Sequence, residues 1–256
     1  MNIIEYKEDT KCSAAIIIIN RPKQMNALNK EVFAGLEKSL EIAERSPGIR
    51  SVIITGSGER AFVAGADIKE FQSFSEESAR NLSKTGKQKI FNKLADFSKP
   101  TIAAINGFAL GGGLELALSC HIRVAINSAR LGLPECSLGL IPGYSGTQRL
   151  PRLVGKAHAM EMILGSKIIS AEEAHRIGLV NYVVEGPELL NKCSQISQSF
   201  AKNPPEALSA AINSINSCYK IDGERVETES FAALFGTFNF KEGVSAFLDK
   251  RKPNFR

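Results

Sequence analysis

The first two hundred residues alternate short β-branched runs with longer amphipathic segments, and this alternation restricts the fold more than any other feature of the chain. Buried strands are predicted for four runs, at residues 14–19, 51–55, 101–105 and 121–126. Two segments that lie between these runs, residues 29–45 and about 76–96, have the apolar spacing of helices. The pattern therefore predicts an α/β core of stacked ββα-like units.

The strand signal ends near residue 200, and three helical stretches separated by Pro and Gly follow. We therefore predict a core over 1–200 and a helical C-terminal subdomain over 201–256. Large apolar side chains cluster in the second part, at Phe231, Leu234, Phe235, Phe238 and Phe240. They fit either a small core of this subdomain or an interface between subunits.

The composition of the 256 residues is that of a globular protein, with 43% hydrophobic and 23% charged residues. The apolar run at 14–19 is far shorter than the roughly 20 residues that span a bilayer, so no membrane segment is expected. The N-terminus lacks the pattern of a secretory signal. Five cysteines without a CxxC pair favour reduced thiols, so we expect a cytoplasmic protein. The three histidines lack ligand-like spacing, so no metal site is predicted.

The most informative segment for chemistry is NGFALGGGLELALSC, at residues 106–120. The glycines at 111–113 allow a ligand to approach the backbone, and the N–H groups that open the following helix favour negative charge. Close packing of a helix on a strand also needs small residues. Glu115 stands between two leucines in this apolar segment, so we expect it to be partly buried with a raised pKa, unless it faces solvent.

Two further segments contain weaker signals. In GERAFVAGADIKEF, at 58–71, Asp67 and Glu70 have the spacing of a capping box for a helix that begins near Ile68, which leaves the N–H of Ala66 free. A plain strand–turn–helix junction has the same pattern.

In LGLPECSLGLIPGYSGTQRL, at 131–150, Glu135 alone is typical of a surface or capping residue. Residues 143–146 do not match the nucleophile motif of serine hydrolases, Gly-x-Ser-x-Gly, because the glycine after Ser145 falls one position early.

Together these segments resemble the enoyl-CoA hydratase (crotonase) family over nearly the whole chain. The matching motifs are NRPKQMNAL at 20–28, AGADIK at 64–69, NGFALGGGLE at 106–115, the Pro-Glu to Gln-Arg-Leu segment at 134–150 and EGVSAFLDKRKPNF at 242–255. The resemblance implies a spiral of ββα units, a C-terminal region that drives trimerisation, and a homotrimer or a homohexamer made of two trimers.

The resemblance also implies the site. The N–H groups of Ala66 and Gly112 would form an oxyanion hole, and Glu115 and Glu135 would be the acid–base pair. Their separation of 135 − 115 = 20 residues is the spacing of a hydratase. The positions implied to bind or position the acyl-CoA substrate and the water are Lys23, Ala64, Gly65, Asp67, Ile68, Lys69 and Gly143. Coenzyme A is part of the substrate, and no other cofactor is implied.

The implied reaction is reversible addition of water to a trans-2-enoyl-CoA; an isomerase or another acyl-CoA lyase of the same superfamily is the alternative. Some relatives bind RNA through a lysine-rich segment. The corresponding residues 29–45 balance basic with acidic side chains, so nucleic-acid binding is not expected. Tyr144 is bulky where many relatives have a small residue, which favours short acyl chains. The sequence leaves the metabolic pathway open.

Overall fold

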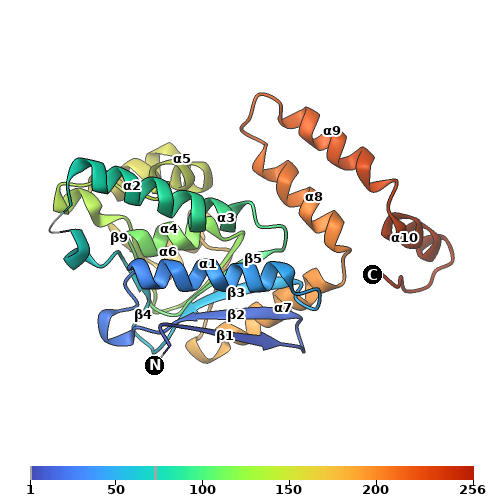
Figure 1. Cartoon of the computed structure of the whole chain (residues 1–256), viewed down its shortest axis with the longest axis horizontal. Coiled ribbons are helices and arrows are strands. Elements are labelled where there is room, and N and C mark those ends of the chain that lie inside the picture. Colours follow the sequence, from blue (N-terminus) through green and yellow to red (C-terminus); the bar gives the residue numbers. More distant parts are fainter. Residues whose placement is uncertain (1, 72–73) are drawn as a thin grey trace.

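The computed structural model describes residues 2–71 and 74–256, except for the side chains of Lys69 and Phe71. Its larger sheet has the strand order β1-β2-β3-β5-β7-β10 (Figure 1). These strands are β1 (Ile4–Asp9), β2 (Ala14–Ile19), β3 (Ser51–Gly56), β5 (Thr101–Ile105), β7 (Ile122–Ile126) and β10 (Tyr182–Val184). β1 is antiparallel to β2, and the other neighbours are parallel. All four predicted strands are therefore confirmed.

A smaller sheet has the order β4-β6-β8-β9. It contains β4 (Ala61–Ala64), β6 (Phe108–Leu110), β8 (Arg130–Gly132) and β9 (Ile168–Ser170). The first three strands are parallel and β9 is antiparallel to β8. In their register, Ala64 pairs with Leu110, and Leu110 pairs with Gly132. The three strands therefore end side by side, and the segments that follow them emerge at one edge of the sheet.

Helices cover these sheets, beginning with α1 (Lys30–Arg45). The Asn29 side chain accepts from Val32 N over 2.9 Å, which supplies the N-terminal cap. The buried stripe of α1 consists of Val32, Leu36, Leu40 and Ala43, as its spacing predicts. The predicted helix at 76–96 is confirmed, but it contains a π-helical turn, η3 (Lys87–Phe91), between α2 (Glu76–Gly86) and α3 (Asn92–Ala95).

The remaining helices of the core follow strands of both sheets: the first three follow β6, β8 and β9, and the last follows β10. They are α4 (Gly112–Ser119), α5 (Gly146–Leu164), α6 (Ala171–Arg176) and α7 (Leu189–Ala201). Short 3₁₀ turns connect elements at η1 (Pro22–Gln24), η2 (Ile68–Phe71), η4 (Pro134–Leu138) and η5 (Gly186–Glu188). Among the described residues, no helix is long and apolar enough to cross a membrane. Nor do these residues bring three or more His, Cys, Asp or Glu side chains together as a metal site would require.

Three C-terminal helices form an arm that extends from the core (Figure 1). They are α8 (Pro205–Asn216), α9 (Gly223–Leu234) and α10 (Phe238–Leu248), which confirms the helical C-terminal region. Phe231, Phe235 and Phe238 are 64%, 48% and 50% exposed. Phe231 meets Phe235 edge-on, and the Phe235 ring lies tilted against Phe240 with the centroids 4.4 Å apart. Three of the five clustered side chains are therefore about half or more exposed in the single chain.

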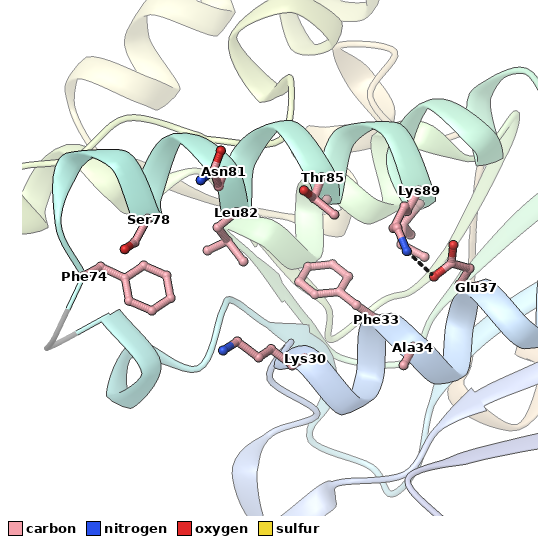
Figure 2. Close-up of a pocket in the computed structure, with 12 residues that line it drawn as sticks. Lys30, Phe33, Ala34, Glu37, Phe74, Ser78, Asn81, Leu82, Thr85 and Lys89 are labelled. Carbon is pink, nitrogen blue, oxygen red and sulfur yellow. Dashed lines mark hydrogen bonds and ion pairs between the residues drawn. The ribbon is translucent and has the colours of Figure 1, made fainter.

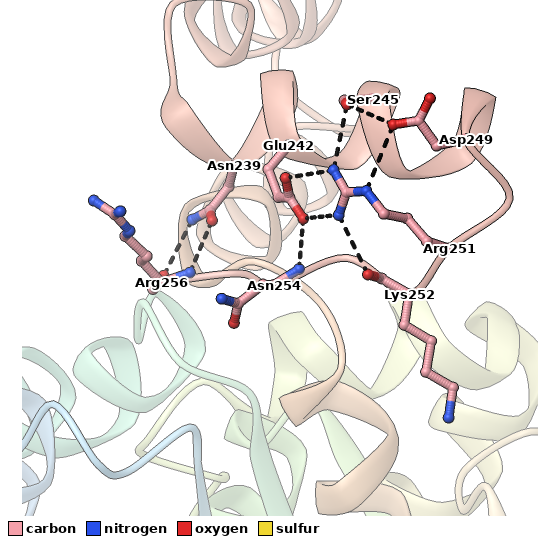
Figure 3. Close-up of polar contacts among 8 residues, drawn as sticks. All are labelled: Asn239, Glu242, Ser245, Asp249, Arg251, Lys252, Asn254 and Arg256. Carbon is pink, nitrogen blue, oxygen red and sulfur yellow. Dashed lines mark hydrogen bonds and ion pairs between the residues drawn. The ribbon is translucent and has the colours of Figure 1, made fainter.

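The last residues fold back onto α10 (Figure 3). Both guanidinium Nη atoms of Arg251 donate to the Glu242 carboxylate, over 2.6 and 3.0 Å. Asn254 N donates to the same carboxylate over 2.7 Å, and Arg256 N donates to Asn239 Oδ1 over 2.9 Å. Because the tail is held by backbone as well as side-chain bonds, it forms an ordered cap on the arm.

Candidate active site

The candidate site lies where β4, β6 and β8 end together. Ala66 follows β4 by two residues, Gly112 follows β6 by two, and Glu135 follows β8 by three. Because Ala64, Leu110 and Gly132 are in register, these three short connections emerge beside one another. Segments 23 to 69 residues apart in the sequence therefore meet at the carboxyl ends of parallel strands, where open α/β sheets usually bind ligands.

Ala66 lies in a parallel bridge with Leu28. Leu28 N donates to Gly65 O over 2.9 Å, and Asp67 N donates to Leu28 O over 2.7 Å. The bonds in this bridge use the groups on either side of Ala66, so its own N–H points to the opposite side. Within the described part of the chain, this N–H has no hydrogen-bond partner. It is oriented and available to donate to a ligand.

Gly112 is the first residue of α4, so its N–H has no carbonyl in a preceding helical turn. Gly111, just before it, has φ +52°, a conformation that favours glycine. A Cβ on Gly113 would lie 1.9 Å from the carbonyl oxygen of Val63, in β4. The glycines therefore do two things: they allow α4 to pack directly against β4, and they expose the N–H groups at the start of the helix.

Glu115 lies in the first turn of α4 and is 1% exposed. Its Oε1 accepts two hydrogen bonds, from Tyr144 N over 2.7 Å and from Gly146 N over 2.8 Å. Burial raises the pKa of Glu115 to about 7, although these two N–H groups and the nearby Arg149 favour the ionised form. The expectation of a buried carboxylate with a raised pKa is confirmed, and the burial is more complete than predicted.

Glu135 lies in η4 and is held less tightly than Glu115. Its Oε2 is buried and has no hydrogen-bond partner among the described residues. A Cβ on Gly111 would lie 3.1 Å from its Oε1, so the carboxylate faces the start of α4. Burial raises the pKa of Glu135, and its charge raises the pKa of Glu115 in turn. The structure therefore brings the two predicted glutamates into one electrostatically coupled site.

Asp67, one of the expected binding residues, also belongs to the predicted capping box. The predicted capping box is wrong: a helix does begin at Ile68, but the Asp67 carboxylate pairs with Arg21 over 2.9 Å instead. Glu70 Oε1 accepts from Lys30 N at 3.5 Å, at the start of α1. Because the Arg21 guanidinium is stronger as a partner than a backbone N–H, it takes Asp67 away from the cap.

The remaining expected residues surround the same edge. Ala64 and Gly65 lie at the end of β4, and Ile68 is 56% exposed just beyond Ala66. Lys23 is exposed in η1, while the side chain of Lys69 lies outside what the structure describes. Gly143 is half-buried in the loop before α5, next to the residue that donates to Glu115.

Comparison with known proteins agrees with this geometry. Residues 9–256 match the family model described as enoyl-CoA hydratase/isomerase. This chain belongs to the enoyl-CoA hydratase/isomerase family. It is 44% identical to a protein of Syntrophomonas wolfei named crotonyl-CoA hydratase, over 99% of this chain and 97% of the relative. It is 42% identical to the short-chain-enoyl-CoA hydratase of Clostridium acetobutylicum, over 98% and 96% of the two chains.

Solved structures show the same fold. The crystal structure of an enoyl-CoA hydratase from Bacillus anthracis has a TM-score of 0.92 and 38% identity, covering 99% of this chain and 98% of that one. A structure of Pseudomonas aeruginosa DspI has a TM-score of 0.93 and 36% identity, covering 100% and 97%. The predicted crotonase-like fold with its helical C-terminal region is therefore confirmed.

A cavity of about 460 Å³ lies beside the site, between α1 and α2 (Figure 2). Phe33 from α1 and Leu82 from α2 point toward each other across it. The Tyr144 ring packs behind this wall, stacked on Phe91 with the centroids 4.5 Å apart and edge-on to Phe33 at 5.7 Å. A Cβ on Gly86 would lie 2.7 Å from the Tyr144 ring, so this glycine makes room for it.

Several residues that shape the site were not predicted from the sequence. The N–H groups of Tyr144 and Gly146 bind Glu115, although nothing in the segment 131–150 indicates that partner. Ser83 and Arg149 bind carbonyls of the same loop. Ser83 carries no signal in the sequence, because a serine in a polar helix is ordinary. The run Gly143 to Gly146 does indicate a tight loop, which was the one available hint.

Proposed function

We propose that this protein is an enoyl-CoA hydratase that adds water reversibly to a trans-2-enoyl-CoA thioester and forms a 3-hydroxyacyl-CoA. The observation that carries this proposal is the pair Glu115 and Glu135, two carboxylates with raised pKa values. Beside them lie the backbone N–H groups of Ala66 and Gly112, which have no hydrogen-bond partner among the described residues. A pair of this kind supplies an acid and a base at one site near neutral pH.

In the proposed mechanism, the thioester oxygen accepts hydrogen bonds from the N–H groups of Ala66 and Gly112. As the water oxygen bonds to C3, the C2–C3 π electrons move toward the carbonyl, and negative charge accumulates on the thioester oxygen. Donors aimed at such an oxygen typically contribute about 10²–10³ each in rate. The N–H at the start of α4 is also at the positive end of the helix dipole.

The two glutamates divide the proton transfers. Glu115, whose ionised form is stabilised by two N–H bonds, orients the water and accepts its proton. Glu135 carries a proton on its unpartnered oxygen and delivers it to C2. Gly143, beside the donor Tyr144, helps to position the water. In the dehydration direction each carboxyl group performs the opposite transfer.

We further propose a preference for short acyl chains, which the names of the two relatives support. Tyr144 is 5% exposed and is packed between other rings, so an acyl chain cannot displace it without breaking the stack. Lys23, Lys69 and the 64–68 backbone would contact the CoA portion. Coenzyme A enters as part of the substrate, and the mechanism requires no other cofactor.

The exposed phenylalanines of the arm support a further part of the proposal, a homotrimer or a dimer of trimers assembled through residues 201–256. Unpaired apolar surface of this kind usually marks a protein interface. A cytoplasmic location is part of the same proposal, since the substrate class and the free cysteines fit a reducing compartment.

The test is to follow the loss of the enoyl-thioester absorbance when purified protein is mixed with crotonyl-CoA, and to identify the product. We expect 3-hydroxybutyryl-CoA. Repeating the assay with enoyl chains of increasing length should show falling kcat/KM, and Tyr144→Ala should raise activity on longer chains relative to crotonyl-CoA. A product with a moved double bond and no added water would instead identify an isomerase, and equal kcat/KM at all lengths would contradict the chain-length preference.

A further inference from the structure

The loop from Gly143 to Gly146 is the only described segment that donates hydrogen bonds to the Glu115 carboxylate. Both bonds go to one oxygen, Oε1, so the other oxygen is left for a substrate or water. The backbone of Ser145 in this loop has φ +77°, a conformation that residues other than glycine rarely adopt. A loop with a strained residue keeps its shape only if its surroundings hold it, and the contacts on its carbonyls show how.

The peptide unit between Gly143 and Tyr144 is held from both edges. Its N–H donates to Glu115 over 2.7 Å, and its carbonyl oxygen accepts from the Ser83 hydroxyl over 2.7 Å. The N–H and C=O of a trans peptide point in opposite directions, so Ser83 and Glu115 lie on opposite sides of one planar group. A hydrogen bond to the carbonyl also polarises the amide and strengthens its N–H as a donor.

The next peptide unit is held by Arg149. Its Nη1 donates to Tyr144 O over 3.1 Å, and its Nη2 donates to Phe91 O over 3.2 Å and to Asn92 Oδ1 over 2.9 Å. One rigid guanidinium therefore joins the loop to the end of the π-helical turn that contains Phe91. π-helical turns often occur at functional sites.

We propose that Ser83 and Arg149 are positioning residues: they fix two successive carbonyls of the Gly143–Gly146 loop so that its N–H groups meet Glu115 Oε1 in the reactive geometry. This inference rests on the proposed role of Glu115 as the base. It adds an unexpected dependence of the acid–base pair on α2, because Ser83 contacts neither glutamate and belongs to a helix that lines the neighbouring cavity.

The position of this loop also controls the charge on Glu115. The titratable and charged groups facing Glu115 are Glu135 from η4, Arg149 from α5, and Tyr144 from the loop itself. Loss of the Ser83 bond weakens the Tyr144 N–H donor, and loss of Arg149 also removes a positive charge. Both changes disfavour the ionised Glu115, so each should move the acid limb of the pH–rate profile to higher pH.

The experiment compares Ser83→Ala, Ser83→Thr and Ser39→Ala with the parent protein. Ser39→Ala is the matched control, since this hydroxyl donates to a backbone carbonyl over 2.8 Å within α1, away from the loop. With crotonyl-CoA, Ser83→Ala should lower kcat about five- to tenfold, the effect of one ordinary hydrogen bond, and leave KM within about twofold. Ser83→Thr keeps a hydroxyl and should restore most of kcat.

The Arg149 variants separate geometry from charge. Arg149→Lys keeps the charge but cannot bridge three acceptors, so it should lower kcat and leave the acid limb near its original pH. Arg149→Gln removes the charge and should move the limb further than Ser83→Ala does. An unchanged acid limb and unchanged kcat in Ser83→Ala would overturn the proposal, as would equal losses in Ser83→Ala and Ser39→Ala.

A second readout does not depend on hydratase activity. ¹³C NMR titration of glutamate carboxyl groups, with the Glu115 signal identified by its absence in Glu115→Gln, measures the pKa directly. Ser83→Ala should raise the pKa of Glu115, and Ser39→Ala should not. If the parent protein hydrates no enoyl-CoA, the proposed function fails; the titration still decides whether Ser83 controls Glu115, and an unchanged Glu115 pKa in Ser83→Ala rejects it.

Discussion

The two glutamates of the site belong to regions of opposite character. Glu115 is on a buried helix, α4, and both bonds to its Oε1 come from the backbone of one loop. Glu135 is on a short 3₁₀ turn, and its buried Oε2 has no partner among the described residues. Burial raises both pKa values. The Glu115 carboxylate is held by hydrogen bonds from the protein, whereas one oxygen of the Glu135 carboxylate lacks a donor among the described residues.

This difference explains how two residues of one type can perform opposite tasks. N–H donors stabilise a carboxylate but cannot bond to the proton of a carboxylic acid, so they favour the basic form of Glu115. An oxygen without a donor is stabilised by protonation, which favours the acid form of Glu135. Because each charge disfavours ionisation of the other carboxyl group, the pair loses its second proton at a higher pH than an isolated glutamate would.

The largest expected effect comes from replacing each carboxylate with its amide. Glu115→Gln and Glu135→Gln should each lower kcat for crotonyl-CoA hydration by about 10²–10⁴, because an amide neither accepts nor returns a proton at this pH. Steady-state kinetics at saturating substrate measures the loss. The double variant should be little worse than either single one, since the two groups act as a unit.

The matched control for this pair is Glu242→Gln, which changes a glutamate of the arm that pairs with Arg251, far from the β4, β6 and β8 ends. Its kcat should stay near that of the parent protein. If both active-site amides keep full activity, the acid–base mechanism is wrong. If only Glu135→Gln keeps it, Glu115 alone performs the chemistry and the proposed division of roles fails.

The second expected effect concerns the N–H of Gly112. Proline at the first position of a helix fits the backbone but removes the N–H. Gly112→Pro should therefore lower kcat about 10²–10³, the usual loss of one oxyanion donor. Gly112→Ala keeps the N–H, and its Cβ would lie 3.3 Å from a methyl of Leu28, so only a small loss is expected. Circular dichroism must show that both variants fold, and equal activity in the two would remove Gly112 N from the mechanism.

The sequence predicts Glu115 much better than it predicts Glu135. Glu115 is identifiable on physical grounds, because a carboxylate between leucines behind three glycines implies burial. Glu135 is not, since a glutamate beside a proline in a loop is ordinary, and only the resemblance and the spacing singled it out. The strands and most helices followed from periodicity, which local sequence encodes directly.

The contacts that hold the site were not predictable for a different reason. The capping box at Asp67 has the correct spacing, but Arg21, 46 residues away, competes for the carboxylate. Ser83 and Gly143 are 60 residues apart, and nothing in either segment indicates the other. Long-range pairings of this kind depend on how the elements pack, whereas a single sequence reports mainly local preference.

The raised pKa of Glu115 also makes the stability of the folded protein depend on pH. The pKa of Glu115 is raised from the usual value near 4.5 to about 7, so between these pH values the folded protein keeps a proton that the unfolded chain releases. Stability must then fall as pH rises across this window and level off above it. At about 1.4 kcal/mol per pKa unit, the full contribution is about 3 kcal/mol.

Urea unfolding at fixed protein concentration, repeated from pH 5 to pH 8, measures this slope. Glu115→Gln has no proton to release, so it should remove most of the slope and be more stable than the parent at pH 8. Glu135→Gln should remove less of the slope, because the Glu135 side chain is less buried than that of Glu115. If the two variants flatten the curve equally, the carboxylates are equally strained in their ionised forms. Glu115 and Glu135 would then differ in the hydrogen bonds that hold them, and not in the energetic cost of their charge.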